Sequence, residues 1–495
     1  MTPIACFQSA SRLSTRMCSR RVLARAFGGA AVMLALALGT AGTAFAQTPV
    51  LTADQAQLRA IYQELVEINT TDSAGDTTQA ARAMAAHLKA AGFADADLHL
   101  IVPPGGPKKG NLVARLKGNG SSGKKPLLLL AHLDVVEAKR EDWQRDPFKL
   151  IEENGYFYAR GAADDKAMAA VFVANLARMK REGVVPNRDI ILALTADEEI
   201  IPSKFSGVEY LLKHHRNLID AALALNEGGT GLRDKAGKPI YHGIQAGEKV
   251  FQTYRLEATN AGGHSARPSK DNAIYHLADG LSRLGKFDFP FKLNDITRAY
   301  FERAAALETG QLASDMRAIL RTPPDAEALM RLTNIPMYNA TFRTTCVATM
   351  LDAGHATNAL PQRARAVVNC RILPGEPVDE VQKTLVRVMA NDKISIAPDG
   401  AAVLSPAPPL SAELMTPVEA ITAQMWPGVP VIPTMLVAAT DGRFLNNAGI
   451  ATYGISGMFR DLDGGGVHGL NERFPVKSLY EGHTFLDRLV RALSF

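Results

Sequence analysis

The sequence predicts an α/β fold: a mostly parallel β-sheet with helices on both faces, into which a separate α+β unit is inserted. Three observations support this prediction. Helical and strand patterns alternate from residue 54 to residue 230. The strand candidates in this region are short, continuously apolar runs, which are typical of strands buried on both faces. After residue 247 the pattern changes to a different mixture of strands and helices.

Length and charge narrow the range of functions. The chain has 495 residues, 47% of them hydrophobic and 21% charged, and this length favours two domains or one domain with an insertion. The formal charge is +5, but residues 1–46 contain five arginines and no lysine, aspartate or glutamate. Residues 47–495 therefore carry no net formal charge, and we expect neither nucleic acid nor an anionic membrane as partner.

The first 46 residues resemble an export signal. Their arginines precede an apolar stretch at residues 26–41, which is followed by Ala44-Phe45-Ala46. A basic region, an apolar region and a small-x-small site predict a signal peptide cleaved after Ala46, and hence a periplasmic or secreted protein. A membrane anchor is the alternative, but the stretch is shorter than the ~20 apolar residues of a span. The pair Arg20-Arg21 leaves both general and twin-arginine export open.

Two cysteines, Cys346 and Cys370, remain after removal of this segment. They are too few for a disulfide scaffold, and their spacing matches no zinc knuckle. A single disulfide and two separate core residues are both compatible with the sequence. No later run is long and apolar enough to span a bilayer.

The elements of the first domain follow in order along residues 47–247. Apolar residues recur at helical spacing at Leu58, Ile61 and Leu65, and again at Met84 and Leu88. Between and after these helices lie the strand candidates, at residues 126–131, 190–194 and 221–225. We expect these strands to lie side by side in the sheet.

The inserted unit is predicted to span residues 248–400. It begins with a strand at 250–258 and a tight turn at 262–265, and a long helical stretch follows at 293–335. Two strand patterns then face each other across a turn at 358–361, and an amphipathic helix covers 378–388. The Pro-rich residues 405–410 mark the return, so that residues 401–495 complete the first domain.

Acidic and histidine residues gather where the predicted strands end. Ligands of open α/β sheets bind beyond the carboxyl ends of the strands, so this position is itself evidence for a site. The residues concerned are His132, Asp134, Asp164, Asp165, Asp197, Glu198, Glu199, Glu227 and, far downstream, His468.

This set of side chains favours metal binding. Carboxylates with two imidazoles and no thiolate suit Zn²⁺, Co²⁺ or Mn²⁺, and their number suits two ions that share one carboxylate and one water. A single Asp or His at a strand end is more often a helix cap or a turn residue. Together, so many buried carboxylates would repel one another without cations.

Three motifs carry a resemblance to a known family. Residues 131–134 read AHLD, residues 160–166 read RGAADDK and residues 196–199 read ADEE. The chain from residue 50 to residue 495 thereby resembles the di-zinc aminoacylase and carboxypeptidase family of metallopeptidases, which includes succinyl-diaminopimelate desuccinylase, acetylornithine deacetylase, carnosinase and carboxypeptidase S. Trp143 with residues 146–148 (DPF) and residues 468–472 (HGLNE) look most like the carboxypeptidase S branch.

The resemblance implies a role for each candidate residue at the metals. His132 and Glu227 would bind one zinc, Glu199 and His468 the other, and Asp164 would bridge the two. Glu198 would be the general base that takes a proton from the bridging water. Asp134 would orient His132 through its second ring nitrogen. The resemblance also implies a cis peptide bond between Asp164 and Asp165.

In the inserted unit the resemblance implies a lid and dimerisation domain. His264 matches the lid histidine that stabilises the oxyanion, often from the partner subunit of a homodimer. Asn358 and Arg371 match residues that hold the carbonyl or terminal carboxylate of the substrate, and Arg443 is expected to serve the same purpose. A monomer in which the stretch 293–335 presents His264 within one chain is the alternative.

The sequence thus predicts a secreted, zinc-dependent exopeptidase of the carboxypeptidase or dipeptidase kind, with two Zn²⁺ per chain. Its substrate would be a small peptide with a free carboxylate next to the scissile amide. An N-acyl-amino-acid amidohydrolase is the alternative on the same site. Acyl-diamino acids of the cytosol fit poorly with an export signal. A non-catalytic binding protein fits poorly with Glu198, since binding alone needs no general base.

Overall fold

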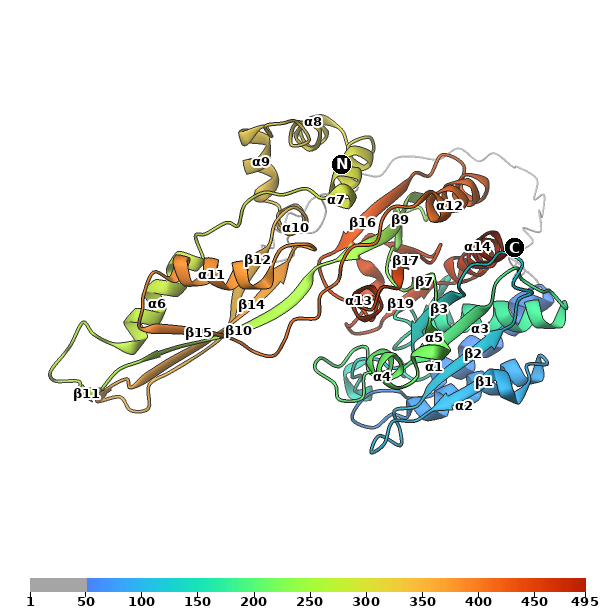
Figure 1. The fold of residues 1–495 in the computed structure, drawn as a ribbon, viewed down its shortest axis with the longest axis horizontal. Helices are drawn as coiled ribbons and strands as arrows, with labels where there is room; N and C mark the ends of the chain where they lie inside the picture. Colours follow the sequence, from blue (N-terminus) through green and yellow to red (C-terminus); the bar gives the residue numbers. More distant parts are fainter. Residues whose placement is uncertain (1–50) are drawn as a thin grey trace, which may run out of the picture.

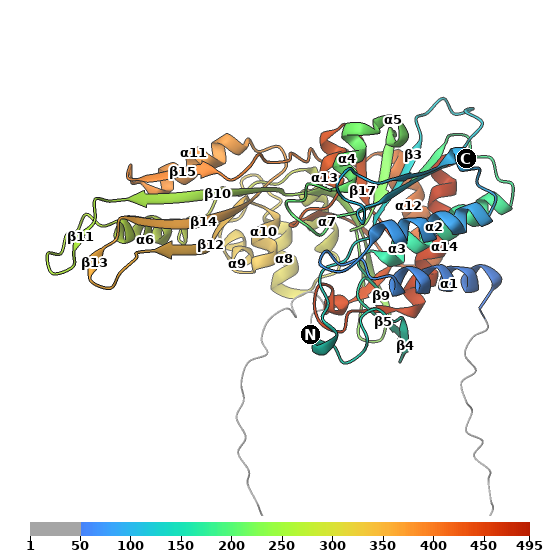
Figure 2. The same ribbon diagram turned by 90° about the horizontal axis from the view of Figure 1, so that it is seen from below.

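The computed structural model describes residues 51–495 and has an elongated shape with a β-sheet at each end (Figures 1 and 2). The predicted signal peptide and its cleavage site lie outside the described residues. Within the described part of the chain, no helix combines the length and the apolar character needed to cross a bilayer.

The larger sheet has ten strands in the order β1-β2-β6-β3-β7-β17-β9-β8-β18, with β16 paired to β9. The strands are β1 (Leu98–Ile101), β2 (Asn111–Leu116), β3 (Leu127–His132), β6 (Ile190–Thr195), β7 (Leu223–Asn226), β8 (Gly231–Arg233), β9 (Pro239–Glu248), β16 (Val431–Leu436), β17 (Ala451–Gly454) and β18 (Phe459–Asp461). The centre, β6-β3-β7-β17, is parallel, and so is the pair β8–β18. The pairs β1–β2, β2–β6, β17–β9 and β8–β9 are antiparallel. The predicted α/β class is confirmed, and the sheet is mixed at its edges.

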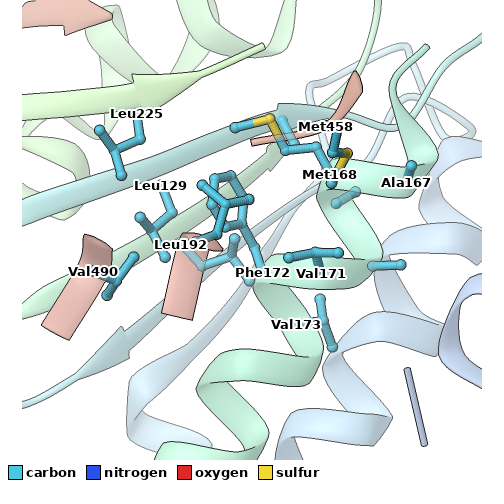
Figure 3. Packing of buried hydrophobic residues seen from close by; sticks show 14 of the residues in the cluster. Leu129, Ala167, Met168, Val171, Phe172, Val173, Leu192, Leu225, Met458 and Val490 are labelled. Atoms are coloured by element: carbon cyan, nitrogen blue, oxygen red, sulfur yellow. The ribbon is translucent and has the colours of Figure 1, made fainter. Parts of the chain in front are cut away.

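Helices cover both faces of this sheet because the central strands bury alternate side chains on opposite sides. Leu127 and Leu129 belong to the core on one face, and Leu128 and Leu130 to the core on the other. The first face is covered by α1 (Ala53–Glu67), α2 (Thr77–Ala90), α3 (Lys166–Arg181), α12 (Ala412–Met425) and α14 (Val476–Ser494). The second is covered by α4 (Gly207–His214), α5 (Arg216–Ile219) and α13 (Gly442–Asn447). Figure 3 shows Phe172 of α3 packed against leucines of the sheet.

The central strands end at one edge of the sheet. Parallel pairing places Leu127 of β3 beside Ile190 of β6 and also beside Leu223 of β7. The carboxyl ends of these three strands therefore lie side by side, and the polar residues that follow them are brought together.

The second sheet is antiparallel, in the order β12-β14-β10-β15. Its strands are β10 (Val250–Thr259), β12 (Thr345–Ala353), β14 (Arg363–Ile372) and β15 (Ile394–Pro398), and α6 (Ala273–Leu284) and α11 (Val378–Met389) pack on one face. Cys346 lies opposite Cys370 in the register of β12 and β14, and the two form a disulfide. The structure thus resolves the choice that the sequence left open.

Smaller elements complete the fold. The stretch at 293–335, predicted to be helical, forms the short helices α7 (Asp295–Ala304), α8 (Gly310–Ala318) and α9 (Ala326–Thr333), and α10 (Pro336–Thr341) follows. The two-residue strands β11 (Gly263–His264) and β13 (Ala359–Leu360) pair at the tip of the second sheet, and β4 (Ile151–Glu153), β5 (Tyr156–Tyr158) and β19 (Arg473–Pro475) form a three-stranded sheet. Three short 3₁₀ segments lie at Asp95–Asp97, Arg140–Asp142 and Gly464–Gly466.

Candidate functional site

Five side chains that the sequence marks as metal ligands converge at the carboxyl edge of the larger sheet. His132 is the last residue of β3, Glu227 directly follows β7, and Glu199 lies four residues after β6. Asp164 precedes α3, and His468 lies in the loop after the glycines 464–466. The five residues form two groups that share Asp164, His132–Asp164–Glu227 and Asp164–Glu199–His468, and within each group the ligand atoms lie within 4.8 Å of one another.

Asp164 stands between the two histidines. Its Oδ1 is 3.1 Å from Nε2 of His132, and its Oδ2 is 3.2 Å from Nε2 of His468. Nε2 of His132 is also 3.8 Å from Glu227, and Nε2 of His468 is 2.9 Å from Glu199. One carboxylate with an oxygen facing each group is the arrangement expected of a ligand shared by two ions.

The donor set fits two divalent cations. Burial raises the pKa of Glu227 well above its usual range, and the nearby carboxylates of Asp164 and Glu198 raise it further. Such crowded, buried carboxylates favour a site where positive charge is supplied. Imidazole nitrogens with carboxylate oxygens, and no thiolate, are ligands that zinc accepts.

Asp134 organises the loop that carries Glu198 and Glu199. Its two carboxylate oxygens accept hydrogen bonds from the backbone N–H of Glu198, at 3.1 Å, and of Glu199, at 3.0 Å. Nδ1 of His132 lies 3.0 Å from the backbone oxygen of Asp134 and 3.7 Å from its carboxylate. Asp134 is thus placed to orient both His132 and the segment after β6.

Asp197 contributes a contact that sequence reasoning missed. It adopts a left-handed φ of 59°, and its carboxylate accepts hydrogen bonds from Nζ of Lys109, at 2.8 Å, and from the Ser203 hydroxyl, at 2.6 Å. These contacts hold the turn directly before Glu198. The acidic run 197–199 was visible in the sequence, but no pattern indicates Lys109 as its partner.

The peptide bond between Asp164 and Asp165 is cis. This is the geometry that the family resemblance implies, and the structure confirms that prediction. Asp165 is the residue before α3, so the bond lies where the chain turns from the ligand loop into that helix.

The four predicted substrate-binding residues occupy two separate places. Arg371 lies near the end of β14 that is close to the junction of the two sheets. Burial and the nearby Arg443 lower its pKa there. His264 and Asn358 lie together at the far tip, where the backbone N–H of Ser265 donates to the Asn358 carbonyl at 3.0 Å. Because a strand rises about 3.4 Å per residue, the ends of the ten-residue β14 are about 30 Å apart. Both views place β11 away from the larger sheet (Figures 1 and 2).

A pocket of about 610 Å³ lies between the two sheets, beside the loop of Glu198 and Glu199. Apolar side chains from both sides form much of its wall: Ile200, Ile201, Pro202, Phe251, Val403 and Phe444. Arg443 also lines it, is 9% exposed, and has a buried Nη1 with no hydrogen-bond partner among the described residues. The pocket therefore has a largely apolar wall and is lined by a buried guanidinium together with the carboxylates of Asp197, Glu209 and Asp399.

Comparisons with known proteins agree with this geometry. Residues 128–492 match the model of the peptidase family M20/M25/M40. The chain is 28% identical over 377 residues to the N-fatty-acyl-amino acid synthase/hydrolase PM20D1 of Mus musculus, and the aligned region covers 74% of each chain. It is 28% identical over 401 residues to the probable carboxypeptidase S-like 2 of Dictyostelium discoideum, and this aligned region covers 77% of this chain and 74% of that one. The crystal structure of the M20 family metallo-carboxypeptidase Sso-CP2 from Sulfolobus solfataricus shares the fold, with a TM-score of 0.64 and 18% identity over 90% of this chain and 99% of that one.

Proposed function

We propose that this chain, which belongs to the peptidase family M20/M25/M40, hydrolyses an amide bond that lies next to a free carboxylate. Family membership makes it a metal-dependent peptidase or amidohydrolase with a dinuclear site. Glu198 lies in the loop between the two candidate ligand groups, which share Asp164, and the pocket lined by Arg443. This placement is the observation that carries the finer proposal.

We assign zinc to the dinuclear site, with Co²⁺ or Mn²⁺ as replacements. His132 and Glu227 would hold one ion, Glu199 and His468 the other, and Asp164 both. The chemistry that such a pair of ions supplies is a water of lowered pKa and a polarised amide carbonyl. Asp134 keeps the ring of His132 and the backbone of Glu199 in place for this purpose.

Glu198 is the proposed general base. Its side chain is 8% exposed, and burial raises its pKa well above the usual range, as do the nearby carboxylates of Asp441, Glu199 and Asp134. A carboxylate with a raised pKa is a better proton acceptor at neutral pH. Glu198 would take a proton from the attacking water and pass it to the leaving nitrogen.

Arg443 and Arg371 are the proposed anchors for the substrate carboxylate. Neither guanidinium forms an ion pair within 4.0 Å in the described chain, although the charge of Arg443 acts on the carboxylates of Glu209 and Asp441 and on Arg371. An anion between them would relieve that repulsion. The apolar wall of the pocket suits an apolar side chain or acyl group, which favours N-acyl amino acids beside apolar dipeptides as substrates.

A panel of matched substrates tests this proposal. We expect hydrolysis of N-acetyl-phenylalanine, N-lauroyl-phenylalanine and a phenylalanine dipeptide, each with a free carboxylate. Their carboxamide counterparts should have a kcat/KM at least ~10-fold lower, because a buried charge-assisted hydrogen bond is lost. Chelation should abolish all hydrolysis, and zinc should restore it. Equal cleavage of acid and carboxamide would contradict the proposed anchor, and undiminished activity after complete demetallation would contradict the mechanism.

We further propose that the protein works as a homodimer joined through the second sheet. Strand β12 is an edge of that sheet, and its Val347, Met350 and Leu351 are 60%, 67% and 69% exposed. An edge strand with exposed apolar side chains is suited to pairing with a second copy. The tip with His264 and Asn358 would then serve the partner's metals.

The helices from the 293–335 stretch support this arrangement over the monomeric alternative. α7 packs near β16, where Arg303 donates to the Val431 carbonyl at 2.7 Å and pairs with Glu419 at 2.8 Å. Both views place α7, α8 and α9 away from β11 (Figures 1 and 2). These helices are therefore not placed to present His264 to the metal ligands of their own chain.

Export to the periplasm or the medium is proposed from the signal-like first 46 residues. The disulfide between Cys346 and Cys370 supports it, because such bonds persist in oxidising compartments. We expect N-terminal sequencing of the mature protein to begin at Gln47. A mature N-terminus upstream of residue 26 would contradict cleavage.

A further inference from the structure

Glu472 lies four residues after His468 and is completely buried. Its carboxylate accepts four hydrogen bonds from the segment that ends in Asp164. Oε2 accepts from Nη1 of Arg160, at 2.8 Å, and from the backbone N–H of Gly161, at 3.0 Å. Oε1 accepts from the backbone N–H groups of Ala163, at 2.7 Å, and Asp164, at 3.3 Å. One side chain therefore binds three backbone N–H groups of the loop that carries the shared ligand, those of Gly161, Ala163 and Asp164.

The same segment also donates hydrogen bonds to the backbone of the segment that carries Glu472. Arg160 is 2% exposed, and its Nη2 donates to the Gly469 carbonyl at 2.8 Å. The backbone N–H of Ala159 donates to the Glu472 carbonyl at 3.2 Å. The Arg160 guanidinium stacks over the ring of Trp143, 5.1 Å from its centroid. The two segments are thus joined by an ion pair and by hydrogen bonds to both the side chain and the backbone of residues 469–472.

These two segments are about 300 residues apart in the sequence, and each carries a residue of the Asp164–Glu199–His468 group. We propose that Glu472 is a positioning residue that fixes Asp164 relative to His468 and so sets the geometry of the dinuclear site. The inference rests on the proposed function only in taking these residues as metal ligands.

A carboxylate is suited to this task and an amide is not. The carboxylate has two acceptor oxygens, and both face N–H donors here. Glutamine in its place would turn its NH₂ group toward one pair of those donors, so at least one pair would lose its acceptor. The loop would then shift, and Asp164 would no longer meet both histidines.

Metal affinity of Glu472→Gln tests the inference. The matched control is Asp315→Asn in α8, because Asp315 is also buried, at 4% exposed, and accepts hydrogen bonds from an arginine, Arg331, at 2.8 and 2.9 Å. We expect Glu472→Gln to bind zinc ~10- to 100-fold more weakly than wild type in competition with a chromophoric chelator, the range found for residues that orient metal ligands. Asp315→Asn should bind zinc as wild type does. For Glu472→Gln at saturating zinc, we expect kcat to fall more than KM changes.

A double variant separates loop positioning from charge burial. Removing Glu472 alone leaves Arg160 buried without its counter-charge, which can unfold the protein. Arg160→Gln combined with Glu472→Gln removes both charges, and we expect it to fold but still to bind zinc weakly. Wild-type zinc affinity in either variant would overturn the inference while leaving the proposed function intact. Absence of bound zinc in the wild type itself would overturn both.

Discussion

Replacing Glu198 by glutamine is expected to lower kcat by at least ~100-fold while the protein keeps both metal ions. The lost proton acceptor accounts for the rate, since general base catalysis contributes on this scale, equivalent to about 2.7 kcal/mol of the barrier. The metal content should stay at the wild-type value, because Glu198 belongs to neither ligand group. Steady-state kinetics and elemental analysis of the same preparation measure the two quantities.

Glu199→Gln is the matched control, because it is the same substitution one residue further along the loop. Glu199 lies 2.9 Å from His468, and its replacement should release one ion. The activity of Glu199→Gln should then depend on added zinc, whereas that of Glu198→Gln should not. If the two variants behave in the opposite way, the roles of the neighbouring glutamates are reversed.

Mixing two inactive homodimers is expected to restore activity. His264→Ala removes the proposed oxyanion donor and Glu198→Gln the base, so each homodimer should be nearly inactive. A heterodimer has one site with Glu198 from one chain and His264 from the other. With random exchange of equal amounts, about a quarter of all sites should become competent, given a two-fold dimer. Activity is followed after exchange, and fluorescence energy transfer between labelled subunits verifies that exchange takes place.

His355→Ala is the control for this experiment, because His355 is another exposed histidine in the second sheet's tip region and is assigned no role in the site. We expect it to be active alone. Mixtures of His264→Ala and Glu198→Gln that gain no activity, despite measured exchange, would show that His264 acts within its own chain or not at all.

Three of the five candidate metal ligands could be predicted from the sequence because each lies just after an apolar strand. The apolar runs of β3, β6 and β7 end within a few residues of His132, Glu199 and Glu227. Parallel pairing then necessarily brings those ends together. Asp164 and His468 follow no such run, and their assignment as the shared ligand and the second histidine rests on the family resemblance.

The contacts that hold these ligands could not be predicted in the same way. Lys109 meets Asp197, and Glu472 meets the loop before Asp164, across 88 and 308 residues of sequence. Such pairs depend on tertiary packing and leave no periodic pattern. The separation of Asn358 from Arg371 was equally hidden, because the sequence predicts the strand between them but not which end faces the metals.

Two metal ions that share Asp164 are the central feature of the proposed site. Diffraction data collected at the zinc absorption edge from crystals of the zinc-loaded protein would locate them. We expect two anomalous peaks per chain, one beside His132 and Glu227 and the other beside Glu199 and His468, with Asp164 between. A single peak, or peaks away from these residues, would contradict the account.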